Sequence, residues 1–126
     1  MSAANITAGM NWLGKDYVLK YRFALIRELR GAGLDLPRAY RLIRQDPARA
    51  VDYADEVAEM VAFLLRDAGA EASGEDVFRE CMGDVARVRQ LYALFNWVCG
   101  QHFATSEVAP LPKKAGKSSG GRKASP

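Results

Sequence analysis

Apolar residues recur at spacings of three and four along most of the chain from Lys15 onward, which is the spacing of one face of an α-helix. The first such segment predicts a helix over residues 15–31, which Gly31 and Gly33 end. Asp35 is a suitable N-cap for a short second helix, with Pro37 in its first turn. No alternating run of strand length and no Asn-Gly turn is present in the sequence. The pattern therefore predicts an all-α fold, a small bundle of four or five helices.

The cleanest amphipathic stripe follows Asp46 and Pro47, which are suited to be an N-cap and a first helical residue. Gly69 is expected to stop this helix. Its apolar positions are Ala50, Val51, Ala54, Val57, Ala58, Val61, Leu64, Leu65 and Ala68.

A second long stripe follows Ser73, a predicted N-cap with Glu75 and Asp76 in the first turn, where the positive end of a helix favours acids. The phase of the stripe continues across Gly83, which favours one long helix, and a break with Asp84 as a new N-cap is the alternative. Its apolar positions are Val77, Phe78, Cys81, Val85, Val88, Leu91, Tyr92, Phe95, Val98 and Cys99.

The two ends of the chain have a different composition from the middle. Residues 1–14 are small and polar and are interpreted as a flexible N-terminal arm, in which Met10, Trp12 and Leu13 could dock onto the body. The helical domain is then residues 15–104. Residues 105–126 are expected to form a disordered basic tail, because Pro, Gly, Ser and Lys bury too little surface to offset the entropy of ordering. A length of 126 residues fits one domain.

Charge is unevenly distributed along the chain. All 15 acids precede Pro110, and the tail carries five basic residues, so the tail makes the protein basic. Residues 15–49 hold nine basic and four acidic residues, whereas residues 50–84 hold two basic and ten acidic ones. Such polarity can join elements within a chain or set copies of it head to tail, so self-association is one expectation.

The residues that could carry chemistry are few. His102 is the only histidine, and Cys81 and Cys99 form no CxxC pair, so a surface histidine and two core thiols are expected. The letters GKSSG in the tail match a nucleophile elbow only by composition. We therefore expect no enzyme activity, no cofactor and no metal. No run of 18 apolar residues and no signal-peptide pattern is present, so no membrane association is predicted, and a reduced, cytoplasmic protein is expected.

Three arginines give one functional hypothesis. Arg38, Arg41 and Arg44 fall on one side of the short second helix, which follows another helix after a glycine-containing turn. This is the order of a helix-turn-helix DNA-binding protein, in which the second helix enters the major groove. The acidic segment that follows would repel DNA unless it faced away.

The last helix gives a second hypothesis. Trp97 lies off its main apolar stripe, and Leu94 lies between Trp97 and the stripe, so the apolar face is wider than one core contact needs. The widened face either meets the N-terminal arm or binds a partner protein. The candidate partner-binding residues are Leu91, Tyr92, Leu94, Phe95 and Trp97.

The second half of the chain resembles the tail assembly chaperones of long-tailed phages, the lambda-like G-type proteins. The resemblance covers roughly residues 55–119 and is carried by three segments: the helix ending DEVAEMVAFLLRDAG, the helix EDVFRECMGDVARVRQLYALFNWV, and a Pro-containing exit into a short tail with AGKSS. It implies a non-enzymatic chaperone that binds the tape measure protein and the tail tube protein in the cytoplasm of an infected cell. It also implies a ribosomal frameshift near the tail that makes a longer product.

Overall fold

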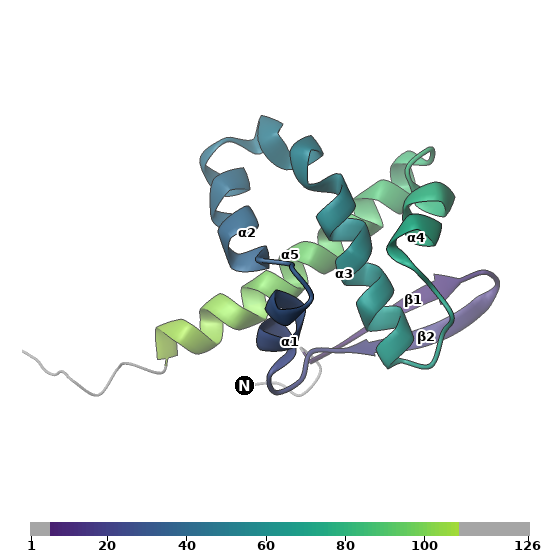
Figure 1. The fold of residues 1–126 in the computed structure, drawn as a ribbon, viewed down its shortest axis with the longest axis horizontal. Coiled ribbons are helices and arrows are strands. Elements are labelled where there is room, and N and C mark those ends of the chain that lie inside the picture. Colours follow the sequence, from purple (N-terminus) through teal and green to yellow (C-terminus); the bar gives the residue numbers. More distant parts are fainter. Residues whose placement is uncertain (1–5, 109–126) are drawn as a thin grey trace, which may run out of the picture.

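The computed structural model describes residues 6–108 and contains both helices and strands (Figure 1). A two-stranded antiparallel sheet comes first, and five α-helices and one 3-10 helix follow within the described residues. The all-α prediction is therefore wrong, and the fold is a small α+β mixture. The elements are β1 (Thr7–Trp12), β2 (Lys15–Lys20), α1 (Leu25–Gly31), α2 (Leu36–Gln45), the 3-10 helix η2 (Pro47–Tyr53), α3 (Ala54–Asp67), α4 (Gly74–Cys81) and α5 (Val85–Val108).

The N-terminal segment forms a β-hairpin. Its register pairs Thr7 with Lys20 at one end and Trp12 with Lys15 at the other, so only Leu13 and Gly14 form the turn. Both turn residues have positive φ, 52° and 86°, as a two-residue hairpin turn that follows the right-handed twist of its strands requires. The flexible arm over residues 1–14 and the helix starting at Lys15 are both wrong for the residues described.

The hairpin is held by its inner face. Met10, Trp12 and Leu19 are buried in the core, and the Trp12 indole N–H donates a 3.3 Å hydrogen bond to the carbonyl oxygen of Glu71. An isolated two-stranded hairpin is marginal in water, so these contacts stabilise it. The expected docking of Met10 and Trp12 is confirmed, whereas Leu13 is exposed at the turn.

Two of the predicted caps are present, and one caps a different element. Asp35 accepts a hydrogen bond from the Arg38 backbone N–H at the start of α2, as expected. Asp46 accepts one from the Ala48 N–H, but it caps η2, and the α-helix proper begins later, at Ala54. Ser73 forms a reciprocal capping box with Asp76 at the start of α4.

The boundary between the last two helices differs from the favoured prediction. Helix α4 ends at Cys81, and α5 begins at Val85, so the single long helix across Gly83 is wrong. The Asp84 carboxylate accepts hydrogen bonds from the N–H groups of Ala86 and Arg87, at 2.9 and 3.4 Å. The alternative break at Asp84 is the observed one.

Helix α3 lies in the middle of the molecule, with α2 on one side and α4 on the other, while α5 crosses behind it (Figure 1). Gly69, with φ 101°, ends the turn after α3 as predicted. Residues 105–108 of the predicted tail belong to α5, and the rest of that tail lies outside the described residues. The largest fully buried side chains are Phe95, Leu19, Leu25, Leu29, Leu36, Met60, Leu64, Leu65, Leu91, Val57, Val61 and Val77.

Candidate protein-binding surfaces

The predicted partner-binding face of α5 lies largely inside the molecule. Leu91, Leu94 and Phe95 are buried, and Tyr92 and Trp97 are half-buried against the core. The Tyr92 hydroxyl donates a 2.7 Å hydrogen bond to the Ala50 carbonyl oxygen, which ties α5 to η2. The apolar face is wide because α2, α3 and α4 all pack on this one helix. These five residues therefore do not form an exposed partner surface.

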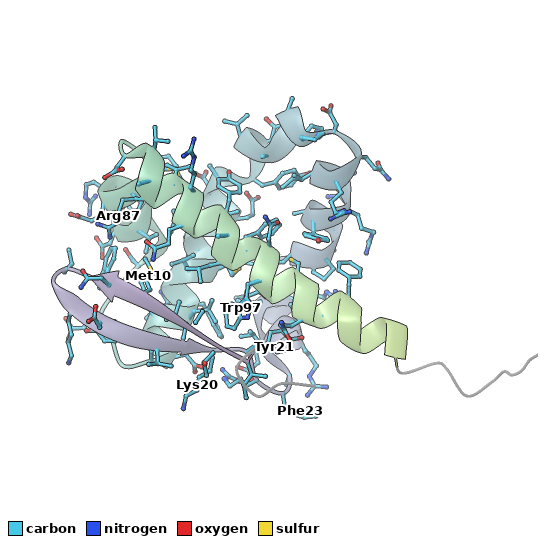
Figure 2. All side chains as sticks on the ribbon, turned by 180° about the vertical axis from the view of Figure 1, so that it is seen from behind. Met10, Lys20, Tyr21, Phe23, Arg87 and Trp97 are labelled. Atoms are coloured by element: carbon cyan, nitrogen blue, oxygen red, sulfur yellow. The ribbon has the colours of Figure 1, made fainter. Side chains whose placement is uncertain are left out.

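The most exposed aromatic side chain in the described part of the chain is one that the periodicity did not single out. Phe23, between β2 and α1, is 89% exposed, and the Arg27 guanidinium lies 5.8 Å from its ring centroid. The next residue, Ala24, has φ 68°, a left-handed conformation that costs a non-glycine residue about 1 kcal/mol. Figure 2 shows Phe23 at the edge of the molecule, below the end of the hairpin.

The residue before Phe23 fixes this loop. The Arg22 guanidinium forms a two-bond fork with Glu28, both bonds at 2.8 Å, and a second one with Asp67, at 2.8 and 3.1 Å. Arg22 therefore joins the loop to α1 and to the end of α3, and its hydrogen bonds lower the pKa of Glu28. The Arg22 hydrogen bonds and the left-handed conformation of Ala24 together hold Phe23 outside the core.

A second surface lies between α2 and the C-terminal half of α5. The Tyr40 and Phe103 rings stack with centroids 5.3 Å apart, and the Arg44 guanidinium lies 5.5 Å from the Tyr40 ring centroid and donates a 3.2 Å hydrogen bond to its hydroxyl. Two adjoining hollows of about 390 and 500 Å³ open here, and we call them together the basic groove. Its lining residues are Tyr40, Arg41, Ile43, Arg44, Pro47, Asn96 and Phe103.

The three arginines of the DNA-binding hypothesis lie at this surface. Arg38, Arg41 and Arg44 are all exposed on α2, and neither Arg41 nor Arg44 pairs with a carboxylate in the described part of the chain. His102 is nearby, and its pKa is lowered by burial and by the positive charges of Arg30 and Arg41. This end of the molecule is therefore strongly basic around an aromatic pair.

A third surface, the acidic groove, lies between the N-terminal half of α3 and α4. It is a hollow of about 290 Å³ lined by Asp55, Ala58, Glu59, Gly74, Glu75 and Phe78. The Glu59 carboxylate lies over Gly74, where a Cβ would collide with it. Phe78 is 40% exposed, so the groove has an aromatic side among carboxylates.

The candidates for catalytic or metal chemistry are not gathered into one place. Cys81 and Cys99 are buried free thiols, as predicted, and burial raises the pKa of Cys99 to about 12. Within residues 6–103 no group of three His, Cys, Asp or Glu side chains could hold a metal ion. Among the helices described, none is long and apolar enough to cross a membrane.

Sequence periodicity missed Phe23 and the pairing of Tyr40 with Phe103. Phe23 lies off the apolar stripe that the residue spacing predicts over residues 15–31, and that position outside the stripe was the one available signal. Tyr40 and Phe103 are far apart in sequence and meet only because α2 packs on α5.

Comparison with known proteins adds no relative: no family model, no curated protein and no solved structure matches the chain.

Proposed function

We propose that this protein is a non-enzymatic phage tail assembly chaperone that binds the tape measure and tail tube proteins. The observation that carries protein binding is Phe23, an almost fully exposed aromatic side chain on a loop that Arg22 fixes to two helices. An isolated exposed phenylalanine costs solvation free energy, and a rigid aromatic side chain loses little entropy when a partner buries it. The phage assignment is supported by the sequence resemblance.

Arg27 would favour partners that place a carboxylate or an aromatic ring beside Phe23. Its guanidinium lies beside the Phe23 ring and is available to a carboxylate or aromatic ring on a partner. Aromatic and arginine side chains are the two residue types most enriched among interface residues that dominate binding. We therefore propose Phe23 as the anchor and Arg27 as its polar neighbour.

The test is capture of separately purified tape measure and tail tube proteins by the full chain. Phe23→Ser should weaken capture about 30-fold or more, as loss of a central aromatic anchor does. Val51→Ser is the matched control, because Val51 is an exposed apolar residue, at 73%, on a different element. Both variants should keep the wild-type circular dichroism spectrum. If Phe23→Ser captures both proteins as well as the wild type does, Phe23 is not the binding anchor. If the wild type captures neither protein at micromolar concentration, the proposed chaperone function is wrong.

The phage assignment has its own test. The intact masses of the products made from the native DNA should include a minor, longer chain that shares residues up to about Lys117 and then diverges. A single product ending at Pro126 would count against the frameshift that the resemblance implies.

DNA binding is the second candidate function, because Arg38, Arg41 and Arg44 are all exposed on α2, which follows α1 after a four-residue connection. A duplex should then shift in a gel at low salt, and Arg41→Ala should reduce the salt slope by about one unit. Lys15→Ala, on the hairpin, is the control. No shift by the wild type at low salt would exclude this function.

A further inference from the structure

We propose that copies of this chain associate head to tail, with the surface around the basic groove of one copy packing against the surface around the acidic groove of the next. The two grooves have the same design with opposite charge. Each has an aromatic side, Tyr40 with Phe103 in one and Phe78 in the other, next to charged side chains of one sign. The occupant is a second copy because the matching surface is present on the chain itself.

Most of the charged groups that would meet are not paired within the copy; the exception is Glu75 of the acidic groove, which pairs with Arg79 at 3.4 Å. Arg41 and Arg44 form no ion pair with any described residue, and the same is true of Asp55 and Glu59. An exposed guanidinium and an exposed carboxylate gain most from a partner when that partner also removes apolar surface from water beside them. Unpaired arginines on one side and unpaired carboxylates on the other are the groups such a contact uses.

The two grooves cannot meet within one copy. Helices α2 and α4 lie on opposite sides of α3 (Figure 1). The arginines are on α2, whereas Asp55 and Glu59 are on α3 and line a hollow with residues of α4, so the two grooves are on opposite sides of α3. Basic residues are in excess over residues 15–49, which include α2, and acidic residues are in excess over residues 50–84, which include α3 and α4. Complementary fields on opposite sides of a body steer two bodies into the same orientation, one behind the other.

The contact joins two different surfaces, so it is heterologous. In a dimer, one copy keeps its acidic groove unused and the other keeps its basic groove unused, so the dimer has one free groove of each kind. Further copies can then add, either closing a ring or extending a filament, depending on the rotation between neighbours. The Phe23 loop belongs to neither groove, so this association is independent of the proposed partner protein.

Two variants test the proposal by sedimentation of the full chain, and each has the charged side chains of one groove neutralised. The first is Arg41→Gln with Arg44→Gln, and the second is Asp55→Asn with Glu59→Gln. All four positions are outside the buried core, and circular dichroism verifies that the fold is kept. Neutral replacements are used because reversing the charges on both sides would rebuild the contact.

The wild type should associate with rising concentration, about tenfold more weakly at 0.5 M salt than at about 0.05 M, since screening shortens the reach of exposed charges. Each variant alone should be monomeric. The 1:1 mixture should form a dimer and nothing larger, because each variant supplies one working groove and the other end is blocked. Arg38→Gln should behave as the wild type, because Arg38 is exposed on α2 but lines neither hollow.

Three results would overturn the proposal. One is a wild type that stays monomeric at millimolar concentration and low salt. Another is a 1:1 mixture that remains monomeric. The third is single variants that associate as the wild type does. If the wild type is monomeric and the Arg41 and Arg44 variant loses duplex DNA binding, these arginines are assigned to nucleic acid instead.

Discussion

Replacing Trp12 with alanine tests whether the hairpin belongs to the cooperative core. Trp12 is 3% exposed, and its indole N–H bonds the Glu71 carbonyl across 59 residues of sequence. A tryptophan buries about 150–250 Å², which at roughly 25 cal/mol per Å² corresponds to about 4–6 kcal/mol as an upper bound. Alanine keeps part of this contact, so we expect Trp12→Ala to lower the free energy of unfolding by about 3–5 kcal/mol.

Trp12→Phe separates the two contributions to this loss. Phenylalanine keeps most of the apolar contact but leaves the Glu71 carbonyl without its donor, which costs about 1–2 kcal/mol. Urea unfolding followed by far-ultraviolet circular dichroism measures both variants. Intrinsic fluorescence is a poor probe here, because it would lose one of the two tryptophans, Trp12 and Trp97.

We expect an ordered series of stabilities, with the wild type most stable, Trp12→Phe next and Trp12→Ala least stable. Hydrogen exchange of the Met10 and Leu19 amides should accelerate in the same order, because these residues share the inner face of the hairpin. If Trp12→Ala lowers the free energy of unfolding by less than about 1 kcal/mol, the hairpin does not belong to the cooperative core and is instead a docked arm.

Three further results follow from the helix caps and the buried thiols. Ser73→Ala and Asp84→Ala should each lower the free energy of unfolding by about 1 kcal/mol, measured by thermal unfolding, because each removes an acceptor for helix N–H groups. Cys99 should resist iodoacetamide at pH 8 until the protein unfolds, since burial raises its pKa to about 12. Hydrogen bonds from Ser73 lower the pKa of Asp76, so its contribution to stability is complete above the carboxyl's unfolded value of about 4 and is lost as pH falls through the folded one. Acid titration of Asp76→Asn should therefore show a smaller loss of stability below pH 4 than the wild type shows.

Local chemistry was enough to place several features from sequence. Asp35 and Ser73 are N-caps as predicted, and Gly69 ends the turn after α3, because each of these depends on a few neighbouring residues. Many positions of the two predicted stripes are buried in the core, as their spacing implied, but Val51, Phe78 and Val85 are exposed, so the stripes were wrong at these three positions. The buried state of both cysteines also followed from their place in an apolar stripe.

Sequence alone could not place the hairpin. In residues 15–21 the spacing of Tyr17 and Tyr21 fits a helix, while Tyr17 and Leu19 fit a strand, and a short apolar run does not decide between them. The strand forms because β1 is available to pair with it and because Trp12 and Leu19 find a core to cover. A hairpin turn built on Leu13 also lacks the Asn-Gly signal, so the usual marker was missing.

The candidate site depended on tertiary structure even more. The width of the α5 stripe was visible in sequence, but only packing decided that three other helices cover it and leave Leu91 and Phe95 inside. Packing also brought Phe103 onto Tyr40 beside Arg44, and the Arg22 contacts held Phe23 outside. By itself the sequence determined where helices are capped and which faces are apolar, because these depend on neighbours along the chain. Only the tertiary structure decided which apolar residues stay exposed, because exposure depends on elements distant in the sequence.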